Sequence, residues 1–159
     1  MRRRRDPSDT LTESPRAAAL KLLSRRDYTT AEIERRLAER GHEADAIAAT
    51  IAALTSARLL DDNRVGAAFV RNASGMKGRG KLRIARELEA RGVSRPLIRE
   101  LTAGLTAEDE ATAIARVLDR MRVRHPIDPD TRRRLFGRLL RRGFTADAIG
   151  KALKVNRTD

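Results

Sequence analysis

The sequence has no cysteine and no tryptophan, and aromatic residues make up 3% of it. The lack of cysteine excludes disulfides, thiolate catalysis and cysteine-ligated zinc. The two histidines, His42 and His125, lie 83 positions apart without a carboxylate cluster around either, so we expect no metal site. No apolar run approaches a membrane span, and the basic start Met1 to Arg5 is not followed by a hydrophobic signal segment. We therefore expect a cytoplasmic protein without cofactor or membrane association.

The composition favours an all-α fold. Alanine, leucine, arginine and glutamate dominate the 159 residues, whereas the β-branched and aromatic residues that form strands are scarce. The chain is long enough for one ordinary core, but helices can also form stackable units that each bury their own.

The net charge of +13 is concentrated in two stretches. Residues 71–95 hold eight Lys or Arg against two Glu, and residues 116–142 hold ten Arg against three Asp, which together account for the whole excess. This clustering is typical of a surface for phosphates or for an acidic protein. Arg outnumbers Lys 30 to 5. Codon bias explains that ratio equally well, so it is the position of the charges that is informative.

The chain resembles itself at a spacing of 51 residues. Five positions recur in three copies at this spacing: Ile33, Ile84 and Leu135; Leu37, Leu88 and Leu139; Arg40, Arg91 and Arg142; Gly41, Gly92 and Gly143; Ile47, Ile98 and Ile149. Repetition at such a period indicates stacked supersecondary units. Each copy predicts a short helix that ends at the Gly as its left-handed C′ residue, followed at once by a second helix.

A third helix precedes these two in each copy, over about Arg16 to Ser24, Val65 to Ala73 and Ala107 to Met121. The sequence therefore predicts three tandem three-helix repeats, a solenoid-like arrangement, over residues 16–60, 61–105 and 106–155. Residues 1–15 have no periodicity and are expected to be a disordered basic tail, as are the last few residues.

Residues 75–81 match the spacing GxxxxGK of a phosphate-binding loop. We reject that interpretation because Leu82 stands where Ser or Thr would hold magnesium and no strand is predicted before the loop. Two interpretations stay open. The segment is either a mobile basic connector, in which glycines free the backbone for Lys77, Arg79 and Lys81 to reach anions, or a merely flexible loop.

The two helices around each Gly resemble a helix-turn-helix, but the second helix argues against base-specific DNA binding. In the first copy it offers mostly Ala, Ile, Leu and Thr, without Arg, Lys, Asn or Gln to bind base edges. Its expected role is packing. His42 stands where the other copies have Val93 and Phe144, so we expect it half-buried in a turn rather than acting as a ligand.

Three parts of the chain together carry a resemblance to a known family. They are Leu59 to Phe69 (LLDDNRVGAAF), the glycine-rich basic connector before Leu82 to Leu88 (LRIAREL), and the opening Ala19 to Arg26 with Glu32 to Leu37. The family that they resemble is the RecX family of recombination regulators. The resemblance covers about residues 16–155 and is weaker in the third copy, where only Leu-Arg-Arg-Gly-Phe stands out. The Arg-rich tail, His42 and Val65 depart from the family pattern.

The resemblance implies three three-helix repeats in an elongated, curved body without enzymatic activity. Members of the family bind the RecA recombinase, lie in the groove of the RecA–DNA filament and restrain filament growth, strand exchange and the ATPase and coprotease functions of RecA. A long basic solenoid suits such a groove because it contacts several repeating subunits at once.

We therefore expect a monomeric negative modulator of RecA filaments, acting in recombination, DNA repair and the SOS response, that also contacts single- and double-stranded DNA through phosphates. The expected contacts are Arg71, Lys77, Arg79, Lys81, Arg83, Arg86, Arg132, Arg133, Arg138, Arg141 and Arg142. Asp61 and Asp62 are expected to cap helices instead. The alternative is an autonomous basic module that coats DNA without a protein partner, and no catalytic residues are expected.

Overall fold

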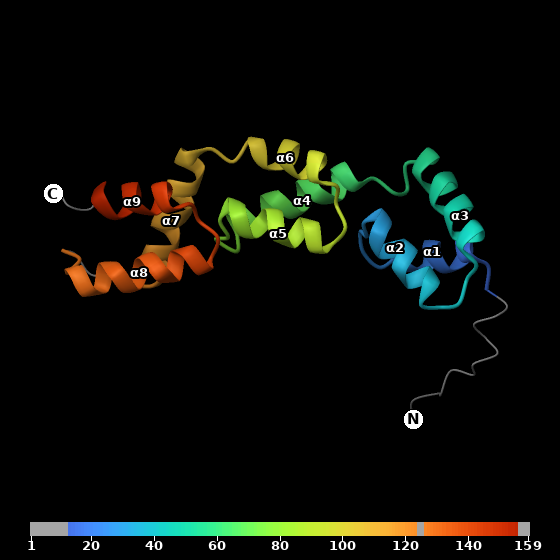
Figure 1. Cartoon of the computed structure of the whole chain (residues 1–159), viewed down its shortest axis with the longest axis horizontal. Helices are drawn as coiled ribbons and strands as arrows, with labels where there is room; N and C mark the ends of the chain where they lie inside the picture. The colour runs from blue at the N-terminus through green and yellow to red at the C-terminus, as the bar shows by residue number, and fades with distance from the viewer. Residues whose placement is uncertain (1–12, 124–125, 156–159) are drawn as a thin grey trace, which may run out of the picture. The chain divides into compact units, whose positions relative to one another are not determined.

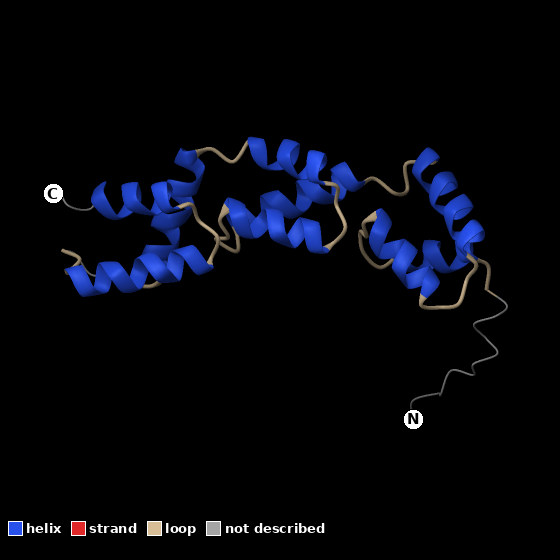
Figure 2. Ribbon diagram, in the orientation of Figure 1, coloured by secondary structure: helices blue, strands red, loops and turns tan. Residues whose placement is uncertain are grey.

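The computed structural model describes residues 13–123 and 126–155, and every regular element within these ranges is an α-helix (Figure 2). The helices, in the chain order drawn in Figure 1, are α1 (Pro15–Leu23), α2 (Thr30–Ala38), α3 (Ala44–Ser56), α4 (Asp62–Gly75), α5 (Lys81–Ala90), α6 (Arg95–Ala103), α7 (Ala107–Arg120), α8 (Pro129–Arg141) and α9 (Ala146–Val155). The all-α prediction is confirmed. Most of the tail predicted for residues 1–15 lies outside the described residues, but α1 already begins at Pro15.

The chain divides into two compact units. The N-terminal unit comprises Met1–Val65 with Arg91–Val93, and the C-terminal unit comprises Gly66–Ala90 with Ser94–Asp159. In the first, α1, α2 and α3 pack against one another; in the second, α7 and α8 pack on α9, and α5 packs on α6. The boundaries of the three predicted repeats stay a prediction.

Local sequence explains where most helices begin. Thr29 and Glu32 form a capping box at the start of α2, and Thr106 and Asp109 form one at the start of α7. The Asp128 side chain accepts two backbone N–H groups at the start of α8. Ser94 is the N-cap residue of α6, but its hydroxyl accepts no capping hydrogen bond.

The three repeated glycines end helices as predicted. Gly41, Gly92 and Gly143 have φ angles of 81°, 80° and 84°, the left-handed conformation that glycine adopts without the steric penalty of a side chain. His42, which follows the first of them, is half-buried as expected.

The apolar positions that recur every 51 residues are all buried, and other apolar residues complete the two cores around them. Ile33, Leu37 and Leu54 are fully enclosed in the core of α1, α2 and α3. Ile114, Leu139, Phe144 and Ile149 belong to the core of α7, α8 and α9. These side chains supply most of the apolar burial that holds each helix in place.

A glycine turn packs against the start of a helix in each unit, in two contacts that follow the same plan. In the first turn contact, the Thr29 hydroxyl donates to the Arg91 carbonyl at 2.6 Å, and Gly92 lies against Ala31. In the second, the Gly80 N–H donates to the Arg142 carbonyl at 2.9 Å, and Gly143 lies against Arg83. Thr29 and Gly80 are themselves 51 residues apart.

Each turn contact also includes a carboxylate that binds the first N–H of the helix. Asp62 accepts from the Thr30 N–H of α2 at 2.8 Å, and Glu110 accepts from the Lys81 N–H of α5 at 3.1 Å. Asp61 accepts from the Arg64 N–H of its own helix at 2.9 Å. The prediction that Asp61 and Asp62 cap helices is confirmed.

Candidate functional site: a cationic hollow in the C-terminal unit

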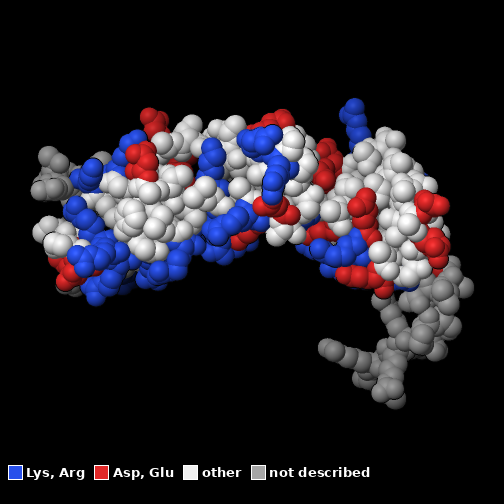
Figure 3. Space-filling model, viewed as in Figure 1, with Lys and Arg blue, Asp and Glu red and all other residues white. Residues whose placement is uncertain are grey.

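An open hollow in the C-terminal unit is lined by seven cations and Met76. The cations are Lys77, Arg79, Arg83, Arg120, Arg138, Arg141 and Arg142, and we call this group the cationic hollow. They come from the connector after α4, the first turn of α5, the end of α7, the last turn of α8 and the residue that follows α8. Figure 3 shows blue side chains gathered over α8 at the lower edge of the molecule.

The connector that carries Lys77 and Arg79 is docked rather than free. The N–H of Arg79 donates to the Ala73 carbonyl at 3.0 Å, and the N–H groups of Gly80 and Leu82 donate to the carbonyls of Arg142 and Gly143 at 2.9 and 3.0 Å. The prediction of a mobile connector is therefore wrong, and so is its flexible-loop alternative. Helix α4 precedes the connector, which also rules out the phosphate-binding loop.

The glycines of the connector serve close packing. Gly78 has a φ of 56°, and a side chain there would meet Val117 at 2.7 Å. At Gly80 a Cβ atom would lie 2.2 Å from the Phe144 nitrogen and 2.3 Å from the Gly143 carbonyl oxygen. Backbone passes so close to backbone at this point that only glycine fits.

Arginines from two other helices hold the connector in place. Arg120 of α7 donates to the Met76 carbonyl at 3.1 Å, and Arg142 lies 3.5 Å from the carbonyl oxygens of Lys77 and Gly78. These contacts are to neutral acceptors, so they leave the positive charge of both guanidinium groups uncompensated.

One carboxylate partly neutralises the hollow. Glu87 of α5 pairs with Arg79 and, at 2.9 Å, with Arg83. Within the described part of the chain, no carboxylate pairs with Lys77, Arg138 or Arg141. The hollow therefore carries a large positive excess, and its walls can bind an anion with several charged oxygens.

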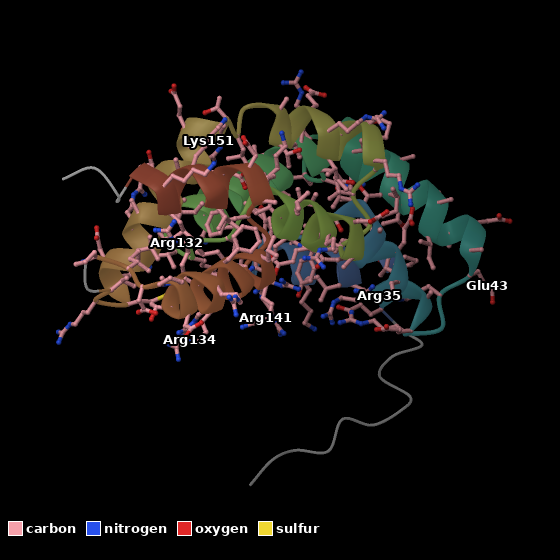
Figure 4. The ribbon with its side chains drawn as sticks, turned by 60° about the vertical axis from the view of Figure 1, so that its left-hand side comes forward. Arg35, Glu43, Arg132, Arg134, Arg141 and Lys151 are labelled. Atoms are coloured by element: carbon pink, nitrogen blue, oxygen red, sulfur yellow. The ribbon has the colours of Figure 1, made fainter. Side chains whose placement is uncertain are left out.

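Six of the eleven predicted contact residues line the hollow: Lys77, Arg79, Arg83, Arg138, Arg141 and Arg142. The other five, Arg71, Lys81, Arg86, Arg132 and Arg133, do not. Arg133 pairs with Asp130 at 3.8 Å on the exposed side of α8. In Figure 4, Arg134 and Arg141 project from one side of α8 and Arg132 lies on the other; its Nε atom is buried without a hydrogen-bond partner.

Sequence reasoning missed Arg120. Its charge was counted within residues 116–142, but no local pattern marks it as different from Arg116 or Arg122. It belongs to the hollow because α7 ends beside the connector, a proximity that only the folded chain creates.

Lys81 lines a different hollow, of about 220 Å³, together with Arg79, Arg116, Asp109 and Glu110. Both carboxylates of this hollow already accept backbone or hydroxyl hydrogens, Glu110 from the Thr145 hydroxyl at 2.7 Å. Because its charges are mixed, this hollow does not select for an anion.

The first turn contact has a buried ion pair where the second has the cationic hollow. The Glu32 carboxylate accepts from Arg91 Nε and Nη2 at 3.2 and 2.9 Å and from the Thr29 N–H at 2.9 Å. Burial raises the pKa of Glu32, but the hydrogen bonds from Arg91 and Thr29 outweigh it, so its pKa lies below the ordinary value of a glutamate.

Comparison with known proteins places these features in context. A family model described as the first three-helix domain of RecX matches residues 16–54, and the model of the second three-helix domain matches residues 61–101. The regulatory protein RecX of Halorhodospira halophila is 38% identical over 143 residues, which cover 89% of this chain and 87% of that protein. The regulatory protein RecX of Mycolicibacterium vanbaalenii is 37% identical over 87% of this chain and 80% of its own length.

The fold also matches a solved structure. The crystal structure of RecX from Lactobacillus salivarius superposes with a TM-score of 0.81 at 20% identity, covering 96% of this chain and 99% of that one. Separately, no helix within residues 13–123 and 126–155 is both long and apolar enough to cross a membrane.

Proposed function

The chain belongs to the RecX family of regulatory proteins, and from that premise we propose that it binds the RecA nucleoprotein filament and inhibits its extension and activities. The relatives are named as regulatory proteins, not as enzymes. That name does not say which assembly is regulated or which surface of the chain binds it.

The observation that carries the proposal is the cationic hollow. A RecA filament on DNA is a polyanion with phosphates at regular spacing, and seven convergent cations against one carboxylate favour such a partner. Three of these side chains, Arg120, Arg138 and Arg141, come from the ends of two helices, which hold side chains more precisely than loops do.

The test is the rate of RecA's ATP hydrolysis on single-stranded DNA as the protein is added below one copy per RecA, at moderate salt. We expect inhibition at these low ratios. The double variant Arg138→Glu/Arg141→Glu reverses two charges of the hollow and should require about tenfold more protein for the same inhibition.

The matched control reverses the same number of charges elsewhere in the unit. Arg95 and Arg99 lie on α6 outside the hollow, and Arg95 is 81% exposed and paired with Glu89. The variant Arg95→Glu/Arg99→Glu has the same net charge as the hollow variant and should inhibit like the wild type. Equal loss in both variants would contradict the assignment of the hollow.

The DNA-coating alternative gives a different result in this assay. A protein that acts only by covering DNA has no effect until it saturates the strand, and its binding weakens steeply and uniformly as salt rises. Inhibition that begins only at saturation would therefore exclude filament binding.

A further inference from the structure

The two turn contacts share a backbone plan but differ in one charge. Glu32 is the third residue of α2 and Arg83 is the third residue of α5, and the two are 51 residues apart. The arginines that face them, Arg91 and Arg142, are also 51 residues apart. An acid therefore meets an arginine in the first contact, whereas an arginine stands beside an arginine in the second.

In the first contact, the negative charge of Glu32 is balanced by the positive charge of Arg91. The Glu32 side chain is 9% exposed and receives two hydrogen bonds from the Arg91 guanidinium. Such a charge-assisted, two-point pair leaves neither group in need of a ligand.

The second contact lacks that carboxylate. Arg142, the counterpart of Arg91, reaches only the carbonyl oxygens of Lys77 and Gly78, both at 3.5 Å. Arg83 turns to Glu87 one turn further along α5. Glu87 corresponds to Arg36 of α2, 51 residues earlier. The two positions therefore carry Glu and Arg in α2 but Arg and Glu in α5, so both charges are reversed.

Arg83 also stands against the local rule for helix ends. The first turn of a helix carries a partial positive charge, which favours acids, yet the first turn of α5 has no acid and includes both Lys81 and Arg83. A residue that violates a local preference is often functional. Arg83 does so, and the Glu87 carboxylate that it contacts is shared with Arg79. A bound anion beside Arg83 would offset the unfavourable interaction of Arg83 with the positive end of the α5 dipole. It would also offset the repulsion between Arg83 and Arg142.

We propose that the cationic hollow binds a backbone phosphate of nucleic acid between Arg83 and Arg142, in the place that the Glu32 carboxylate occupies in the first turn contact. The proposal rests on the proposed function, since it names the DNA of the filament as the component that the hollow contacts. A phosphodiester suits the hollow better than an acidic protein surface because its walls offer one apolar side chain, Met76, and no aromatic anchor.

The chain itself supplies the decisive variant. The double change Arg83→Glu/Glu87→Arg copies Glu32 and Arg36 into the second contact and leaves the net charge unchanged. Glu at position 83 should pair with Arg142 as Glu32 pairs with Arg91, so the variant should fold while its phosphate site is occupied from within.

The control is the same exchange at an exposed pair. Arg35 of α2 and Glu39, the residue that caps the end of α2, are four residues apart, and their charged atoms lie 3.9 Å from each other (Arg35 is labelled in Figure 4). Both side chains are more than half exposed. The variant Arg35→Glu/Glu39→Arg alters the same residue types at the same spacing. A third variant, Arg83→Gln, removes the cation without reversing it, in case the first exchange unfolds the protein.

The measurement is the fluorescence anisotropy of a labelled single-stranded oligodeoxythymidylate, titrated with each protein at several salt concentrations and without RecA. The exchange at positions 83 and 87 should weaken binding about tenfold and reduce the salt slope by about 0.7 for the lost phosphate. Arg83→Gln should also weaken binding, and the control exchange should bind like the wild type. Thermal unfolding should show all three variants folded.

Two results would overturn the proposal. If Arg83→Glu/Glu87→Arg and Arg83→Gln bind the oligonucleotide like the wild type, the hollow is not a phosphate site. If they retain oligonucleotide binding but lose inhibition of RecA, the hollow meets protein carboxylates instead. A wild type that binds the oligonucleotide through Arg83 yet never inhibits RecA would defeat the proposed function and leave the phosphate site standing.

Discussion

Glu32 lies at the third position of α2, where its carboxylate is enclosed by the Arg91 guanidinium and the Thr29 backbone. Removing the charge takes an ionised carboxylate away from a half-buried arginine, which costs more than the net value of an exposed ion pair. The pair therefore has a structural role in the N-terminal unit, unlike the uncompensated arginines of the cationic hollow.

Glu32→Gln keeps the shape of the side chain and removes its charge. We expect the free energy of unfolding to fall by about 1–3 kcal/mol near pH 7, because Arg91 loses a charge-assisted partner. Urea unfolding followed by circular dichroism measures this loss. Glu39→Gln, at an exposed residue paired with Arg35, should change stability by less than about 0.5 kcal/mol.

The effect should depend on pH in a defined direction. Because folding lowers the pKa of Glu32, its contribution is present above the ordinary glutamate pKa and is lost as the pH falls through the lowered value. The difference between wild type and Glu32→Gln should therefore shrink as the pH falls through the lowered pKa, below which both side chains are neutral. A constant difference over this range would contradict the assigned role of the charge.

At the scale of elements, the start of α5 and the turn after α8 depend on glycine for opposite reasons. Gly143 supplies a left-handed residue at the end of a helix, with a φ of 84°. Gly80 instead has no space for a Cβ atom, because the backbone of residues 143 and 144 passes beside it. The cationic hollow exists only when these two segments touch, since one carries Arg79 and Arg83 and the other Arg142.

Gly80→Ala should break this contact. The added methyl group would meet backbone atoms at 2.2 and 2.3 Å, so one of the two segments must move, at a cost of about 3 kcal/mol or more. Thermal unfolding should show a clearly lower midpoint.

Gly75→Ala is the matched control for that change. Gly75 is the last residue of α4, and a Cβ atom there meets nothing within 4 Å. Alanine has the higher helix propensity, so stability should stay the same or rise by up to about 1 kcal/mol. Equal destabilisation in both variants would show that the close packing at Gly80 is not what matters.

At the scale of the whole molecule, charge is divided unequally between the two units. The described residues of the N-terminal unit contain ten Lys or Arg and nine Asp or Glu, and those of the C-terminal unit contain nineteen and ten. The C-terminal unit therefore carries nearly all of the described excess. Self-repulsion of this size lowers the stability of the folded state and is relieved by salt or by a bound polyanion.

Added salt should therefore stabilise the protein. Raising sodium chloride from about 20 mM to about 200 mM shortens the screening length by a factor of about three and should raise the melting midpoint by a few degrees. The Arg138→Glu/Arg141→Glu variant, with less repulsion, should respond less. A midpoint that falls as salt increases would mean that ion pairs outweigh the repulsion.

Helix starts and turns could be predicted from the sequence because they depend on residues that are close together in the chain. The capping boxes at Thr29 and Thr106 and the repeated glycines are short-range patterns of the sequence, and the structure has helix starts and turns at these residues. The expectation for the connector failed because a glycine can serve either backbone flexibility or close packing of two backbone segments. Only the atoms that surround Gly80 in the folded chain distinguish the two roles.

The sequence by itself determined the helices, the turns and the regions of excess positive charge, because each depends on residues within a few helical turns of one another. It also determined the 51-residue period, because that period is a repetition of residue types along the chain. Only the tertiary structure decided which arginines act together. It brought Arg120 beside the connector, turned Arg132 to the opposite side of α8 from Arg141, and set Arg83 beside Arg142 where the first contact has an acid. These outcomes depend on how segments that are distant in the sequence pack together. The residues next to an arginine in the sequence do not indicate which side chains it contacts in the folded protein.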